Sequence, residues 1–273
     1  MVSLVPVPSD ESVTINGAWL GPGQQVRGYG SGPAVAWASG RVVHQPGLHW
    51  RLIAEESATT GLQPILLSGL DGSAERPWDR GEFAAPGDAA DIDLCDAASL
   101  LADGWGGHEP SADEVEADGA EWWADYNSMF EPYGGEFPGL APAIDGDIDP
   151  LRLEVALGQY LSLARIGLVP ATRPADVLTT LGWIGVTNRG WQPAQVSAVL
   201  RSWEDRYGAR LLELGFAEFR LVVSRPPRTV DEALPIAAEH IAFCDECGRM
   251  GLRHVRMLAK TLVGNPFWDF WWD

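Results

Sequence analysis

Positive charge is scarce in this chain of 273 residues, which has 19 lysine and arginine residues, 38 aspartate and glutamate residues and a formal net charge of −19. The deficit lies in one half. Residues 1–150 include 5 basic and 25 acidic residues, whereas residues 151–273 include 14 basic and 13 acidic residues. No lysine or arginine occurs from Gly81 to Leu151, a stretch with eighteen acids. Phosphate contacts need a basic surface, so we expect no nucleic acid partner.

Cysteine and long apolar runs are also scarce. Three cysteines in a chain of this length do not make a disulfide framework. No window approaches the roughly eighteen uncharged apolar residues that a membrane span needs. The start, Met1–Pro6, has no basic region ahead of an apolar run, unlike a secretory signal. We therefore expect a cytoplasmic protein with no membrane partner.

Common catalytic and ligand-binding motifs are missing. The sequence has no Gly-x-Ser-x-Gly elbow, Walker loop or His-Glu-x-x-His, which disfavours the common hydrolase and nucleotide-binding classes. Residues 28–32 hold three glycines, but Pro33 stands where a dinucleotide loop needs another, so a turn is predicted. Residues 145–149 resemble a calcium loop, but Pro150 and Ala156 occupy its glycine and glutamate positions. A solvated acidic turn is predicted there.

The N-terminal half is predicted to be β-rich and to carry acidic helices. Strand composition, Gly-rich turns and one short helical segment support this interpretation. The expected strands are Ser12–Ile15, Ala34–Trp37, Val42–Val43, His49–Leu52 and Gln63–Ser68, with turns at Gly21–Gly23 and Gly28–Gly32 and a helix at Ala97–Ala102.

Residues 109–150 are acidic but rich in aromatic rings. Disordered acidic segments lack such rings, so we expect Asp113–Phe130 to be largely helical and packed by them. A second helix is expected from Pro150 to Gly167, where it joins the two halves. Exposed aromatics beside acids mark interfaces. The candidate binding surface comprises Trp122, Trp123, Glu121 and Asp125, with Trp271 from the end of the chain.

The C-terminal part, residues 171–273, is predicted to be a second domain after an N-terminal domain of residues 1–170. Its expected order is β-α-β-β-α-(α)-β, the ferredoxin-like split βαβ arrangement of an α+β fold, with the last strand at the sheet edge beside the first. In the last strand, alternation places Trp268, Phe270 and Trp272 on one face. The expected elements are strands at Val177–Trp183, Ala209–Leu214, Glu218–Val223 and Phe267–Trp272, and helices at Gln192–Tyr207, Thr229–Cys244 and Leu252–Val263.

Three segments of this part resemble a known family. They are Arg201–Ala209, Ala237–Cys244 and Phe267–Asp273. They are similar to the C-terminal domain of a bacterial, actinobacterial-type family catalogued only as domain of unknown function 4253. A weaker likeness covers Thr60–Leu62 and Arg76–Trp78. The resemblance implies no reaction, because the family has no established activity.

Two chemical hypotheses rest on the same helix. His240, Cys244 and Cys247 have spacings of four and three, and His254 follows, but the return histidine pair of a zinc finger is missing. The related sequences do not keep the second cysteine, which disfavours a shared metal site. Cys244 with His240 as base is a possible nucleophile, although a helix C-terminus disfavours thiolate. A buried Cys244 beside a hydrogen-bonded His240 is favoured over both, and we expect no cofactor.

Composition and patterning leave three functional hypotheses open. The favoured one is a non-catalytic cytoplasmic binding protein, similar to an inhibitor or an immunity protein, which presents an acidic aromatic surface to a basic protein. The second is a metal-dependent or cysteine-based enzyme that uses His240 and Cys244. The third is a structural component of a larger assembly, bound through the tryptophan-rich end. At Trp203–Arg206, a core tryptophan beside a solvated charged surface is expected.

Overall fold

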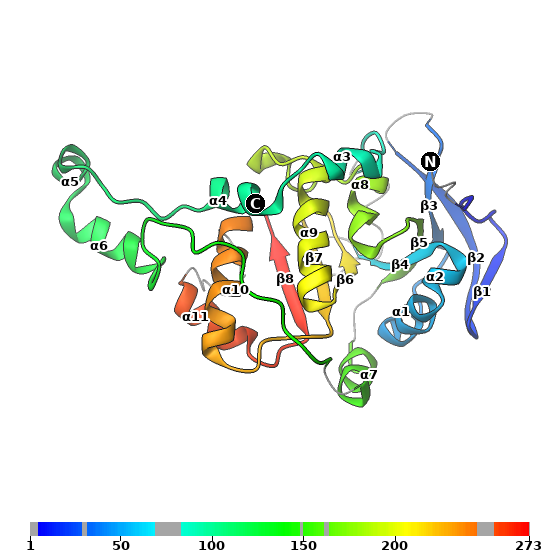
Figure 1. The fold of residues 1–273 in the computed structure, drawn as a ribbon. Coiled ribbons are helices and arrows are strands. Elements are labelled where there is room, and N and C mark those ends of the chain that lie inside the picture. The colour runs from blue at the N-terminus through cyan, green and yellow to red at the C-terminus, as the bar shows by residue number, and fades with distance from the viewer. Residues whose placement is uncertain are drawn as a thin grey trace.

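In the computed structural model, one mixed sheet runs through the molecule (Figure 1). The structure describes residues 5–28, 32–68, 83–147, 150–160, 164–244 and 254–272. Within them the sheet has eight strands in the order β1-β2-β3-β5-β4-β6-β7-β8. Helices cover both faces, so the predicted α+β class is confirmed. No helix in these ranges combines the length and apolar character needed to cross a membrane.

The N-terminal strands mostly follow the sequence pattern. There are four strands before residue 70, namely β1 (Ser12–Ile15), β2 (Ala18–Arg27), β3 (Ala34–Ser39) and β4 (Leu62–Leu67). The pairs β1–β2 and β2–β3 are antiparallel, and β4 is antiparallel to β5 and parallel to β6. The turn predicted at Gly21–Gly23 is wrong, because these residues lie inside β2 and pair with β1 and β3. The Gly28–Gly32 turn lies largely outside the described residues.

The strand predicted at His49–Leu52 is also wrong, because these residues lie in α1 (Pro46–Glu55), which begins with a proline in its first turn. Trp50, Ile53 and Ala54 are buried at helical spacing, and this face packs on the sheet. Val42–Val43 is not part of a strand. A short α2 (Ser57–Thr60) leads into β4.

The C-terminal elements are confirmed from residue 193 onward. They are α9 (Pro193–Tyr207), β6 (Ala209–Leu214), β7 (Glu218–Val223), α10 (Val230–Phe243), α11 (Val255–Leu262) and β8 (Phe267–Trp271). The strand predicted at Val177–Trp183 is wrong. That segment is η2 (Pro174–Asp176) followed by α8 (Val177–Leu181), whose Val177, Leu178 and Leu181 are buried at helical spacing before a left-handed Gly182. A one-turn η3 (Thr187–Arg189) follows.

The strand order differs from the ferredoxin-like arrangement. The last strand, β8, lies at a sheet edge as expected, but it pairs antiparallel with β7, and the strand predicted to lie beside it, Val177–Trp183, does not form. The strand before that segment is β5 (Arg165–Pro170). The strand β4 lies between β5 and β6, antiparallel to β5 and parallel to β6. The sheet therefore contains strands from both sides of the boundary predicted after residue 170.

Two apolar clusters lie on opposite faces of the sheet. One contains the buried sides of α9, α10 and α11 with Trp268, Phe270 and Trp272 of the last strand and its end. The other contains α1 and α7 (Pro150–Gly158) packed on β3, β4 and β5. Both clusters mix residues from the two sides of position 170. The alternation predicted for the tryptophan-rich end is confirmed, since Trp268, Phe270 and Trp272 are at most 2% exposed.

Four short helices carry the acid-rich segment. They are α3 (Ala89–Asp93), α4 (Ala97–Gly104), α5 (Ala112–Asp118) and α6 (Ala120–Ser128). Helices α3 and α4 pack against the helical layer, whereas α5 and α6 project beyond α10, at the end of the molecule opposite β1 (Figure 1). We call residues 109–128 the acidic arm. The helical prediction for residues 113–130 is confirmed, with a break at Gly119.

Candidate functional site

Local hydrogen bonds fix the first helix of the acidic arm. Ser111 caps α5, since its hydroxyl accepts from the Glu114 amide at 3.4 Å while the Glu114 carboxylate accepts from the Ser111 amide at 2.8 Å. Bonds from the Ser111 amide and hydroxyl and from His108 hold the pKa of Glu114 at about 2. Gly119, at φ 95°, then ends α5 and begins α6. The arm is therefore an ordered helical pair.

Aromatic rings connect the outer part of the arm to the body. The Trp122 ring stacks on Tyr126, with centroids 5.2 Å apart and planes 10° from parallel. Tyr126 contacts Phe130 at 5.3 Å, and Phe130 contacts Trp105 at 4.9 Å. Trp122 is 51% exposed, whereas Phe130 and Trp105 are buried. The rings thus run from an exposed tryptophan to the apolar core.

The residues predicted as a binding surface do not all share one place. Glu121, Trp122 and Asp125 are exposed on α6. Trp123 on the same helix is buried, and its indole nitrogen donates to the Glu114 carbonyl at 3.3 Å. Trp271 lies half-buried on β8, where its carbonyl accepts from the Cys244 thiol at 3.1 Å. The arm therefore presents three of the five predicted side chains together.

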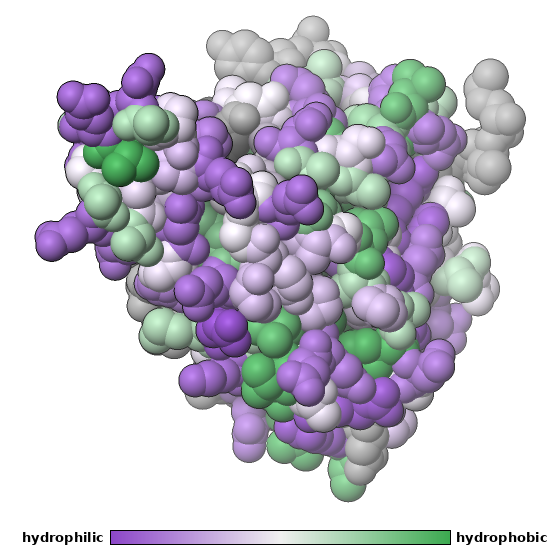
Figure 2. Space-filling view, turned by 60° about the vertical axis from the view of Figure 1, so that its left-hand side comes forward, coloured by the Kyte–Doolittle hydropathy of each residue, from purple (hydrophilic) through white to green (hydrophobic). Residues whose placement is uncertain are grey.

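Two exposed acids of the arm form no ion pair within the described part of the chain. Among those residues, no arginine or lysine lies within 4.0 Å of the carboxylates of Glu121 or Asp125, and the same holds for Glu136 beyond the arm. Figure 2, which turns this side toward the viewer, shows hydrophilic residues over much of the surface. Ions in solution screen the field of exposed carboxylates such as these.

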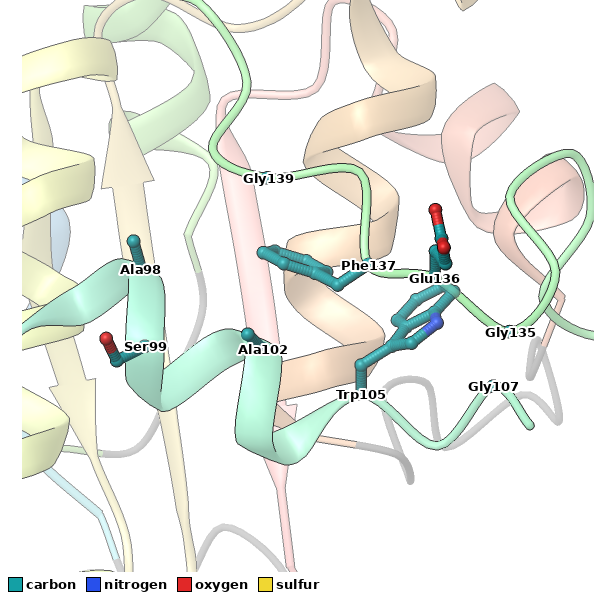
Figure 3. A pocket seen from close by; sticks show the side chains of 9 residues that line it. All are labelled: Ala98, Ser99, Ala102, Trp105, Gly107, Gly135, Glu136, Phe137 and Gly139. Atoms are coloured by element: carbon teal, nitrogen blue, oxygen red, sulfur yellow. The ribbon is translucent and has the colours of Figure 1, made fainter. Parts of the chain in front are cut away.

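A groove lies at the root of the arm, where sequence reasoning placed no site. It is open to solvent, has a volume of about 600 Å³ and lies between α4 and residues 135–139 (Figure 3). The Phe137 ring points toward α4, and Trp105 rises from the end of that helix, with ring centroids 5.9 Å apart. The lining residues are Ala98, Ser99, Ala102, Trp105, Gly107, Gly135, Glu136, Phe137 and Gly139.

A buried carboxylate binds the segment that follows the groove. Glu239 on α10 is fully buried and accepts from both terminal nitrogens of Arg206, at 2.6 and 2.7 Å. It also accepts from the Trp203 indole and the Ala141 amide, each at 2.7 Å. Arg206 donates in turn to the Ala141 carbonyl at 2.9 Å. The segment that carries Phe137 is thereby held against α9 and α10 by charge-assisted bonds.

This geometry corrects the prediction for Trp203–Arg206. Trp203 is in the core as expected, but Arg206 and Glu204 are not a solvated surface, since their side chains are 13% and 20% exposed. Glu204 pairs with Arg173 at 3.3 Å. Burial raises the pKa of Glu204, and the charge of Arg173 opposes that rise. Of the three charged residues, only Asp205, with 67% of its side chain exposed, is solvated as predicted.

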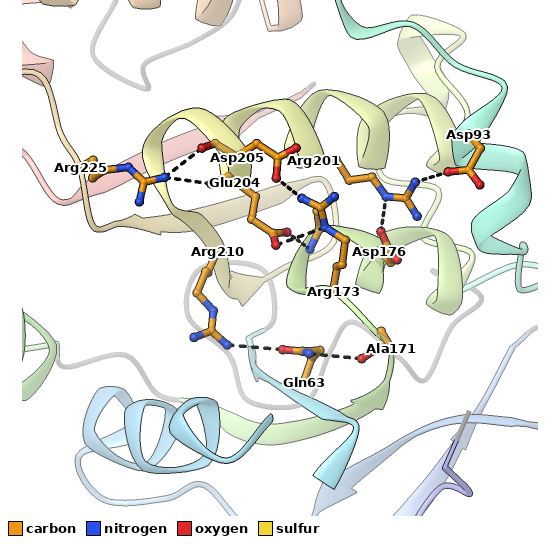
Figure 4. A network of polar contacts seen from close by, with 11 residues as sticks. Gln63, Asp93, Ala171, Arg173, Asp176, Arg201, Glu204, Asp205, Arg210 and Arg225 are labelled. Carbon is orange, nitrogen blue, oxygen red and sulfur yellow. Dashed lines mark hydrogen bonds and ion pairs between the residues drawn. The ribbon is translucent and has the colours of Figure 1, made fainter. Parts of the chain in front are cut away.

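Ion pairs along α9 join the acid-rich segment to the body (Figure 4). Arg201 donates to Asp176 and to Asp93 of α3, each at 2.6 Å. Arg225 pairs with Asp147 at 3.3 Å. These contacts use basic side chains of the C-terminal half at the base of the acid-rich segment, and they leave the projecting arm acidic.

The residues of the metal and nucleophile hypotheses lie in the core. The His240 ring is enclosed by Trp203, Trp268 and Phe270, with centroid distances of 4.6–5.1 Å. Burial lowers the pKa of His240 to about 3. Cys244 is buried at the end of α10. Cys247 lies outside the described residues, and within those residues no group of three or more potential ligands is placed to hold a metal ion.

Comparison with known proteins assigns the C-terminal part but no activity. No curated protein and no solved structure matches the chain. The family match begins at β5, and therefore leaves out the acidic arm and the groove. Residues 165–273 match the family model described as Domain of unknown function (DUF4253), which confirms the resemblance of the C-terminal segments.

Proposed function

We propose that this protein is a non-catalytic binding protein whose acidic arm receives a basic protein partner in the cytoplasm. The observation that carries the proposal is the exposed Trp122, which stacks on Tyr126 on the same helix as the exposed Glu121 and Asp125. A partly exposed tryptophan on a rigid base is a typical interface anchor. Its acidic surroundings select a basic partner and repel an acidic one.

The charge distribution supports an electrostatic mode of recognition. Residues 109–125 carry seven acids and no base. A surface of one sign raises the rate of association with an oppositely charged protein, and salt screens that attraction. An inhibitor or immunity protein for a basic toxin would have this layout, and we propose that type of role for the arm.

The burial of the other candidate residues favours the binding hypothesis over the two alternative functions. His240 and Cys244 are at most 2% exposed, which leaves no surface for a substrate in this conformation. Trp268, Phe270 and Trp272 pack inside the molecule, so an assembly could not dock on them without unfolding the edge of the sheet. The binding hypothesis uses side chains that are already accessible.

Retention of a partner by the immobilised chain tests this proposal. The bait is compared with a Glu121→Gln, Trp122→Ala, Asp125→Asn variant, at salt concentrations of about 0.05 and about 0.5 M. We expect the native bait to retain a partner at low salt and to lose it at high salt. The triple variant should not retain that partner at either salt concentration. Trp19→Ala is a matched control, since Trp19 is 65% exposed on β2, far from the arm.

Two results would contradict the proposal. A partner held equally well at both salt concentrations is not recognised by charge. A partner lost to the same degree with Trp19→Ala as with the triple variant does not depend on the arm.

A further inference from the structure

We infer that the groove between α4 and residues 135–139 binds an arginine side chain of the basic partner. The inference rests on the proposed function and names the chemistry of the contact at the root of the arm. The groove lies next to the ring series that begins at Trp122, because Trp105 is both the last ring of that series and a wall of the groove. A partner lying along the arm would reach it.

The walls of the groove are aromatic and fixed in place. The Trp105 indole nitrogen donates to the Gly134 carbonyl at 3.2 Å, so the hydrogen-bond donor of this side chain already has an acceptor within the protein. The ring is further held by Phe130 at 4.9 Å. Phe137 forms the second wall, tilted by 53° to Trp105. Two such rings attract a cation by their π-faces, most strongly in a partly desolvated site.

The charge around the groove favours a cation over an anion. Among the described residues, the lining contains one ionisable side chain, Glu136, and no lysine, arginine or histidine. Glu109 lies beside the lining, since a Cβ built on Gly135 would be 3.2 Å from its Cγ. A volume of about 600 Å³ is within the usual range for a side-chain or small-ligand site.

Arginine fits this combination better than lysine does. A guanidinium is planar and weakly hydrated, so it can stack on Trp105 or Phe137 while its edge donates to the Glu136 carboxylate. A lysine ammonium is strongly hydrated and offers no flat face to the rings. A neutral apolar side chain would gain ring contacts but would leave the carboxylate without a partner.

A titration of the full chain with three blocked tripeptides tests the inference. The peptides are acetyl-Gly-Arg-Gly-amide, its citrulline analogue, which has the same shape without the charge, and its lysine analogue. Binding is followed by the indole ¹⁵N–¹H resonance of Trp105, assigned with Trp105→Phe. We expect a saturable shift with the arginine peptide and affinity about tenfold lower for citrulline.

Variants test whether the peptide binds in the groove. Glu136→Gln and Phe137→Ala should each weaken the binding of the arginine peptide by about fivefold or more, whereas Trp19→Ala on β2 should leave its affinity unchanged. Glu136 is exposed, so its variant should fold normally, which an unchanged melting temperature would verify. Equal binding of the citrulline and arginine peptides, or no saturable shift, would overturn the inference.

The outcomes distinguish the two proposals. If the native chain retains a partner in a salt-sensitive way and Glu136→Gln retains it equally, the proposed function stands and the groove inference fails. If the arginine peptide binds in the groove but no salt-sensitive partner is retained, the groove is a cation site and the proposed function fails.

Discussion

Glu239 shows how one residue can hold together segments that are far apart in the sequence. Its carboxylate receives bonds from Arg206, Trp203 and Ala141, and none of its surface is exposed. A buried charge is tolerated only when it is paired and its remaining acceptor positions are used. The segment after the arm is therefore positioned by an ion pair inside the helical layer.

Glu239→Ala should lower the free energy of unfolding by about 3–5 kcal/mol, because it leaves Arg206 buried without its carboxylate. Denaturant unfolding would measure the change. Asp231→Ala is the control, since Asp231 is exposed in the first turn of the same helix and should change stability by about 0.5 kcal/mol or less. A loss for Glu239→Ala no larger than that of the control would contradict the role of the pair.

His240 should make stability depend on pH. Its folded pKa of about 3 lies below the ordinary value of 6.5, so the unfolded chain binds the proton more tightly between these values. The stabilisation is complete above about pH 6.5 and is lost as the pH falls toward 3. From pH 7.5 to 5.5 this one group should lower the free energy of unfolding by roughly 1 kcal/mol.

The measurement is denaturant unfolding of the native chain and of His240→Leu at both pH values. Carboxylates contribute equally to the two proteins, so the difference in slope reports His240 alone. The free energy of unfolding should fall by roughly 1 kcal/mol more in the native chain than in the variant. Equal losses would show that the folded histidine still accepts a proton near its ordinary pKa.

At the scale of elements, β8 was predictable because its apolar rings recur at every second residue, which is typical of a strand with one face on the core. Every second residue from Trp268 faces the core, and the residues between them face the other side or solvent. Pairing with β7 places this face against α9 and α10. The tryptophan-rich end is therefore a structural strand.

Trp268→Ala should then cost about 3–5 kcal/mol, as is usual for a large buried ring. Trp271→Ala on the same strand should cost about 1 kcal/mol, because Trp271 is only half-buried. Thermal or denaturant unfolding of the two variants would measure this difference. Equal losses would mean that the two faces of β8 are not distinguished by burial.

Local signals explain which other elements could be predicted. Pro193 in the first turn of α9 and the Thr229 cap of α10 are signals within one helical turn, and both helices were predicted correctly. Val177–Leu181 failed because a short apolar run fits a strand and a buried helix equally well. His49–Leu52 failed because its helical face is visible only when Ile53 and Ala54 are included.

At the scale of the whole molecule, strand order could not be predicted, because it depends on pairing between distant residues. Nothing in residues 62–67 shows that β4 will lie between β5 and β6. The groove was missed for the same reason, since Trp105 and Phe137 meet only through tertiary contacts. The exposed residues of α6 could be predicted because charge and aromatic pattern are local.

Because one sheet crosses the chain, its two ends should unfold together. Leu66→Ala on β4 should cost about 2–5 kcal/mol and should raise hydrogen exchange in β3 and β7 alike near the unfolding midpoint. Exchange measured by mass spectrometry would compare peptides from those strands. Early exchange of β1 to β3 while β6 to β8 stay protected would contradict a single cooperative sheet.

The acidic arm is the part of the molecule that can be removed with the least effect on this sheet. A side-chain contact links the two sides of its base, since the Tyr126 hydroxyl donates to the Gly106 carbonyl at 2.7 Å. Residues 109–125 can therefore be replaced by a linker of about four glycine and serine residues. The replacement removes seven acids and Trp122 but keeps Phe130 and the Glu239 bonds.

Partner binding by this shortened chain, measured beside its unfolding, tests the central claim most directly. We predict that the partner retained by the native chain at low salt is lost, while the free energy of unfolding changes by about 1 kcal/mol or less. Undiminished retention of the partner by the folded, shortened chain would contradict the claim that the arm is the binding element.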